Sequence, residues 1–134
     1  TVLDAGFQSI KLTPLDTCGL VNLSGENYQR IWQAVGDDAL MRAVIENYCI
    51  WAPRVPWMKC DFFTQASSTL FDDVAVYMAY GDDFIAYETI RFHITDEGKT
   101  IRDPQGPHVA DIAIDWKDLP GFRDWLTGRL LGEH

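Results

Sequence analysis

The sequence predicts an α+β fold: one domain over residues 1–134, with a mostly antiparallel sheet of about five or six strands and separate helices. Three observations support this prediction. Residues 74–94 show the two-residue apolar repeat of a long β-hairpin. Apolar residues recur at helical spacing over about 25–51, as a helical hairpin, and again over about 119–131. Strands that run together, apart from the helices, favour an antiparallel sheet with helices on one face.

The central hairpin is predicted to turn at residues 81–83, because a three-residue turn brings even-numbered residues of both strands onto one apolar face. In this register Asp73 lies opposite Arg91 on the polar face, where opposite charges attract. Glu88 is the exception, because it falls on the apolar face.

The remaining elements follow from shorter patterns. Further strands are expected at 7–12, 57–63 and 110–116, and two weaker candidates for short strands are 20–23 and 101–103. Helices are expected to start behind Ser24, behind Asp37 or Asp38, and behind Asp118, because short polar side chains cap backbone N–H groups. Gly98 is expected in the left-handed position of a turn.

Length and composition fit a folded domain, since 134 residues that are 47% hydrophobic can form a core. No apolar run reaches the roughly 18 residues of a membrane span, and the N-terminus lacks a secretory pattern. We therefore expect a cytoplasmic protein without a membrane segment. The cysteines Cys18, Cys49 and Cys60 form no close pair. Buried, reduced thiols are favoured over a disulfide with one free thiol.

The net charge of −9 is unevenly distributed. Residues 1–71 hold 7 acidic and 5 basic residues, whereas residues 72–134 hold 13 and 6. Such a negative field disfavours direct nucleic-acid binding and suits a basic protein partner. The plainer interpretation is that the acidity only keeps the protein in solution.

Catalytic and cofactor motifs are missing from the sequence, which has no GxSxG elbow, P-loop or GxGxxG fingerprint. Residue types that bind metals occur at Cys18, Cys49, Cys60, His93 and His108, but without the close pairs of a structural zinc site. No catalytic residue, metal or cofactor is therefore assigned, and an enzyme is the less favoured class.

Two sets of residues are predicted as sites. The partner-binding set is acidic, with Asp111 and Asp115 as an extension, and consists of Asp72, Asp73, Asp82, Asp83, Asp96 and Glu97. The alternative set would line a pocket and consists of Tyr87, Glu88, Arg91 and His93. A buried Glu88 would have a raised pKa, as a general acid or base requires. Solvated turns and a plain surface pair explain each set without any function.

Two functions follow. The first is a non-enzymatic inhibitor that neutralises a basic partner, such as an immunity or antitoxin protein against a nuclease-like toxin, or a phage-type inhibitor that imitates nucleic-acid charge. The alternative is a small-molecule-binding protein or enzyme that uses the pocket set. The sequence leaves open whether Trp51 and Trp57 are exposed as interface anchors. An exposed edge strand would allow a homo-oligomer, but the sequence does not identify the edges.

Overall fold

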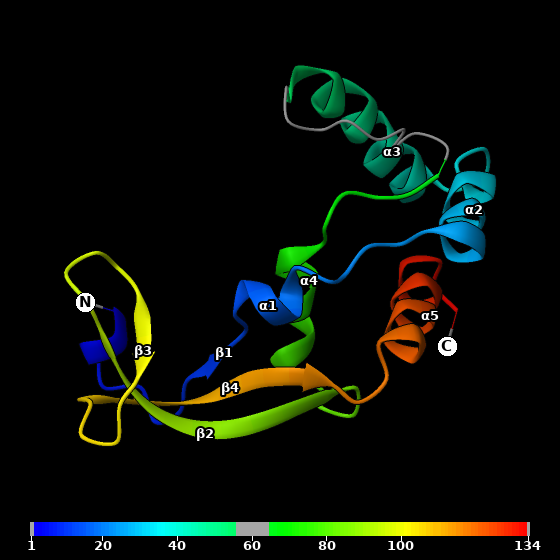
Figure 1. Cartoon of the computed structure of the whole chain (residues 1–134). Coiled ribbons are helices and arrows are strands. Elements are labelled where there is room, and N and C mark those ends of the chain that lie inside the picture. Colours follow the sequence, from blue (N-terminus) through cyan, green and yellow to red (C-terminus); the bar gives the residue numbers. More distant parts are fainter. Residues whose placement is uncertain (1, 56–64, 134) are drawn as a thin grey trace. The chain divides into compact units, whose positions relative to one another are not determined.

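The computed structural model describes residues 2–55 and 65–133. Internal contacts divide the chain into two compact units. Figure 1 labels the helices and strands of both. The first, here called the sheet unit, comprises Thr1–Gly19 and Phe71–Lys117. The second, the helical unit, comprises Leu20–Leu70 and Asp118–His134. This division by contacts does not test the prediction of a single domain, which stays a prediction.

The α+β class is confirmed in the described residues. Residues 2–55 and 65–133 contain five α-helices: α1 (Leu15–Cys18), α2 (Gly25–Ala34), α3 (Ala39–Trp51), α4 (Phe71–Met78) and α5 (Leu119–Leu130). Two short 3₁₀ helices, η1 (Val2–Asp4) and η2 (Ala52–Arg54), accompany them. The strands are β1 (Lys11–Leu12), β2 (Ile85–Ile94), β3 (Thr100–Arg102) and β4 (His108–Trp116).

The sheet is open and mixed, with the strand order β1-β4-β2-β3. β1 runs parallel to β4, whereas β2 is antiparallel to both β4 and β3. The predicted five or six strands and antiparallel sheet are thus matched only in part. The strand expected at 7–12 is shorter than predicted and consists of β1 alone, and 20–23 forms no strand. The strand expected at 57–63 lies outside the described residues.

The first half of the predicted hairpin is wrong, because residues 71–78 form α4. Val74, Tyr77 and Met78 are buried at spacings of three and four, whereas Val76 is 62% exposed. This period is helical. Every residue from 74 to 80 is apolar or aromatic, so alternation alone could not discriminate a strand from a helix. The predicted pairing of Asp73 with a residue of β2 is wrong for the same reason.

The core of the sheet unit is formed by buried side chains from the sheet and from α4. β2 contributes Ile85, Ile90 and Phe92, and β4 contributes Ala110 and Ala113. A hydrogen bond also ties α1 to the sheet, because the buried hydroxyl of Thr17 donates to the carbonyl of Ala113 over 2.8 Å. The indole N–H of Trp116 donates in turn to the carbonyl of Thr17 over 3.0 Å.

The helical unit confirms the predicted helical hairpin and C-terminal helix. Asp38 caps α3, since its carboxylate accepts the N–H groups of Leu40 and Met41. Asp118 caps α5 by accepting the N–H of Gly121. Ser24 occupies the cap position of α2, but its side chain makes no capping bond. The unit buries side chains from all three helices, among them Tyr28, Ile31, Met41, Ile45, Phe122 and Leu126.

None of the helices in the described residues is long and apolar enough to cross a membrane.

Candidate functional site

The six predicted partner-binding acids lie at three places in the sheet unit. Asp72 and Asp73 stand in the first turn of α4. Asp82 and Asp83 are exposed in the turn between α4 and β2, and 96–97 lie in the exposed turn between β2 and β3. α4 has eight residues, or about 12 Å. β2 has ten, or about 33 Å.

The predicted hairpin would have brought Asp72, Asp73, Asp96 and Glu97 together near one end of its strands. This arrangement required Asp72 and Asp73 to lie beside the turn after β2, and α4 replaces the strand that would have placed them there. Asp73 is also partly enclosed, and burial raises the pKa of its carboxyl. Asp82 and Asp83 are an exposed pair directly before β2.

The acidic residues are concentrated in the sheet unit as a whole rather than in one cluster of side chains. Its two segments hold 12 acidic and 5 basic residues, a formal charge of −7. The segments of the helical unit hold 8 and 6, a formal charge of −2. Most of the −9 of the chain therefore belongs to the sheet unit.

Each basic side chain of the sheet unit has a local partner. Lys99 pairs with Glu97 at 3.4 Å, and Arg102 pairs with Glu88 at 2.6 Å. The other three donate to backbone carbonyls: Lys11 to Met78, Arg91 to Gly106, and Lys117 to Asp82. Within the described residues, Asp82, Asp83 and Asp96 form no ion pair.

Glu88 lacks the property that the alternative pocket required. Its side chain is 44% exposed, and both of its carboxylate oxygens accept from the guanidinium of Arg102. These hydrogen bonds lower the pKa of Glu88 rather than raise it. The raised pKa depended on a buried Glu88, and this condition is not met. β3 pairs with β2 only from Phe92 to Ile94, so Glu88 lies beyond the stretch that β3 covers.

Tyr87 is the member of the alternative set whose pKa is shifted furthest from its ordinary value. Burial of its side chain raises its pKa to about 12, and the nearby Tyr77, Asp82 and Asp111 add to the effect. The ammonium of Lys11 stands 5.2 Å from the centre of the Tyr87 ring. The Tyr87 hydroxyl is buried and has no hydrogen-bond partner in the described residues.

The other two members, Arg91 and His93, hold the loop between β3 and β4. Nδ1 of His93 lies 2.9 Å from a carboxylate oxygen of Asp103. The other oxygen of Asp103 accepts the N–H of Gln105. The N–H bond first, and then His93, lower the pKa of Asp103. Together with the bond from Arg91 to Gly106, these contacts fix a turn.

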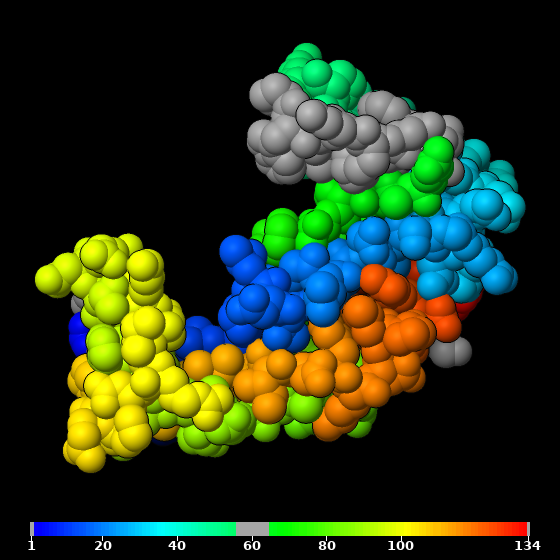
Figure 2. All heavy atoms as spheres, in the orientation of Figure 1, coloured from blue at the N-terminus to red at the C-terminus, as the bar shows by residue number. Residues whose placement is uncertain are grey.

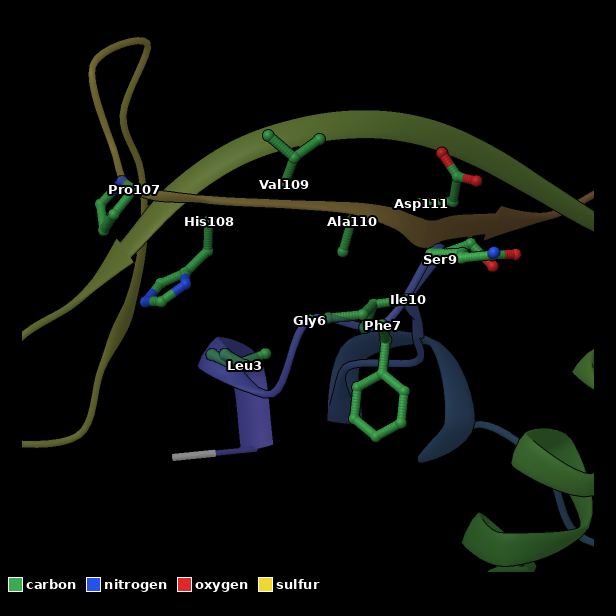
Figure 3. Close-up of a pocket in the computed structure, with 11 residues that line it drawn as sticks. Leu3, Gly6, Phe7, Ser9, Ile10, Pro107, His108, Val109, Ala110 and Asp111 are labelled. Carbon is green, nitrogen blue, oxygen red and sulfur yellow. The ribbon is translucent and has the colours of Figure 1, made fainter.

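Three pockets are described, and none of them is lined by a member of the alternative set. One, of about 360 Å³, lies between residues 6–10 and the start of β4 (Figure 3). His108 and Ala110 point into it, whereas the ring of Phe7 points away from the strand. His108 packs on Phe92, with ring centres 5.6 Å apart, and its Nδ1 stands 3.8 Å from Asp4.

No local pattern in the sequence predicts this pocket, because it depends on the pairing of β1 with β4, in which Lys11 lies beside Asp111.

The described part of the chain contains no group of three or more His, Cys, Asp or Glu side chains that could hold a metal ion. Cys18 is buried and Cys49 is exposed, both as free thiols. The expected burial is thus wrong for Cys49, and Cys60 lies outside the described residues. Trp51 is 42% exposed, whereas Trp57 also lies outside the described residues.

Comparison of the chain with protein-family models, curated proteins and solved structures finds no match.

Proposed function

We propose that the protein is a non-enzymatic binding protein whose acidic sheet unit docks on a basic protein and neutralises it. An immunity or antitoxin protein against a nuclease-like toxin is one such protein, and a phage-type inhibitor that imitates nucleic-acid charge is another. The observation behind the proposal is the formal charge of −7 on the sheet unit, whose basic side chains are all engaged locally.

A charge of this size acts first on the encounter of the two proteins. Complementary fields raise association rates by roughly 10- to 1,000-fold, and salt screens the effect over a Debye length of about 8 Å at physiological ionic strength. The contacts of the basic side chains support the proposal, because an ion pair or a hydrogen bond to a carbonyl offsets part of the repulsion of a basic partner. Asp82 and Asp83 are the exposed acids on which the test is built.

Capture from a cell extract, followed by charge reversal, tests the proposal. The variant Asp82→Lys/Asp83→Lys changes the sheet unit. The control Asp37→Lys/Glu46→Lys makes the same change in net charge at exposed residues of the helical unit. We expect a basic protein to bind the wild type and the control, and the Asp82/Asp83 variant to bind it more slowly. Equal binding by both variants, or the absence of any basic partner, would contradict the proposal.

A further inference from the structure

β2 is longer than the strand that covers one of its edges. β4 pairs with β2 from Ile85 to Phe92, whereas β3 pairs with it only from Phe92 to Ile94. One more bond, from the N–H of Asp103 to the carbonyl of Arg91, extends that contact by a residue. Figure 1 shows β3 beside one end of β2 only. Residues 85–90 thus have a neighbouring strand on one side, and none of the described strands on the other; this second side of residues 85–90 is here called the open edge.

The register determines which backbone groups point to this open edge. The carbonyl of Arg91 faces β3, because it accepts from Asp103. Groups two residues apart in a strand point the same way. The N–H and C=O groups of Tyr87 and Thr89 therefore point to the open edge, where none bonds the backbone of a described residue.

β4 gives the same result independently. The N–H of Asp111 points away from β2, because it donates to the carbonyl of Ile10. The even-numbered residues of β4 at this level must then be the ones that bond β2. Their partners are Glu88 and Ile90, which leaves Tyr87 and Thr89 as the residues facing outward.

The open edge lacks most features that protect sheet edges from added strands. Such features include prolines, lysines, bulges and very short edge strands. Residues 85–90 contain neither proline nor lysine. The irregularity in the β2–β4 pair lies in β4, where Ile114 has no partner on β2. The yellow-green atoms of β2 lie partly at the surface along the lower rim in Figure 2.

We propose that the open edge accepts an extended basic segment of the partner as an added strand. Main-chain hydrogen bonds to Tyr87 and Thr89 would hold the segment, in the manner of known strand-addition complexes. Its basic character rests on the proposed function: Asp82 and Asp83 directly precede β2, and the unit carries a formal charge of −7. A second copy of the chain would bring the same charge and be repelled.

A proline at position 89 tests the open edge without disturbing the pairing of β2 with β4. Thr89→Pro removes an N–H that faces outward and none that bonds β4, and proline is tolerated in strands at such positions. Thr89→Val is the matched control. Both variants lose the hydroxyl that donates to Asp111 over 2.6 Å, but the valine keeps its N–H.

Two peptides of equal charge serve as probes, each about eight residues long. One alternates lysine with valine and can form a strand; the other alternates lysine with proline and cannot. By fluorescence polarisation at low ionic strength, we expect the lysine–valine peptide to bind wild type and Thr89→Val, and Thr89→Pro roughly tenfold more weakly. Equal binding by the two Thr89 variants, or by the two peptides, overturns strand addition.

Amide hydrogen exchange of the wild-type protein gives a second measurement, which holds even where Thr89→Pro fails to fold. We expect the amides of Tyr87 and Thr89 to exchange rapidly in the free protein and slowly with the lysine–valine peptide. Those of Glu88 and Ile90 should be slow in both states, because they bond β4. Slow exchange at Tyr87 and Thr89 in a free protein of dimeric mass would assign the edge to a second copy, and overturn the proposal.

The two proposals fail in different ways. Should neither peptide bind, the basic-partner proposal and strand addition are both contradicted. Should both peptides bind in a salt-dependent way, with no effect of Thr89→Pro, the acidic surface stands and only strand addition is wrong.

Discussion

Removing the buried hydroxyl of Tyr87 should stabilise the protein. This hydroxyl has no partner in the described residues, and an unsatisfied buried polar group costs about 1–3 kcal/mol. Tyr87→Phe keeps the ring beside Lys11 and deletes only the oxygen. We expect the free energy of unfolding to rise by about 1 kcal/mol, which is a Tm increase of about 4 °C for a chain of this size. Denaturant titration and thermal unfolding measure both quantities.

The difference between Tyr87→Phe and wild type should also grow at high pH. Burial raises the pKa of Tyr87 to about 12 in the folded protein, from about 10 in the unfolded chain. The folded state thus favours the neutral phenol, so that the stability of the wild type does not depend on this ionisation below about pH 10 and falls as the pH rises through 12. The phenylalanine variant lacks this loss, and its advantage should widen over that range.

Tyr77→Phe is the matched control, because its hydroxyl does have a partner. It accepts the N–H of Phe84 over 3.3 Å, and the residue is only 3% exposed. This variant should lose about 1 kcal/mol. A loss of the same size in Tyr87→Phe would mean that the Tyr87 hydroxyl is satisfied, and would refute the argument from its burial.

Three further variants test other parts of the sheet unit. Thr17→Val removes the buried bond to the carbonyl of Ala113, and should cost about 1–3 kcal/mol by denaturant titration. Asp103→Asn removes a carboxylate whose pKa is lowered by bonds from Gln105 and His93. It should be less stable than wild type near neutral pH, and the difference should vanish well below the ordinary aspartate pKa of about 4. Val76→Ala tests α4: at an exposed helical position alanine should stabilise by about half a kcal/mol, whereas in a strand the loss of valine should destabilise.

Local signals in the sequence predicted the helical unit well. Asp38 and Asp118 are capping residues in the structure as in the prediction, because a cap depends on only a few neighbouring residues. The turn after β2 follows for the same reason, with Gly98 at a φ of +81°. Each of these features depends only on residues that are close together in the sequence.

The sheet could not be predicted to the same extent, because its pairings join distant segments. The parallel contact of Lys11 with Asp111 fixes β1, and no local pattern specifies it. The run 74–80 is apolar throughout, so that both periods fitted and α4 was mistaken for a strand. With the hairpin lost, β2 has β3 on its second side only from Phe92 to Ile94, and this exposes its open edge.

The exposed turn with Asp82 and Asp83, here called the acidic turn, and the open edge would contribute to binding at different stages. Asp82 and Asp83 act through the field, at a distance and before contact, so their reversal should lower the association rate and its dependence on salt. A bond to the N–H of Thr89 forms only after docking, so its removal should raise the dissociation rate instead. A partner that touched only the acidic turn would show the first effect without the second. Association and dissociation rates of the two variants therefore discriminate docking by charge alone from docking by an added strand.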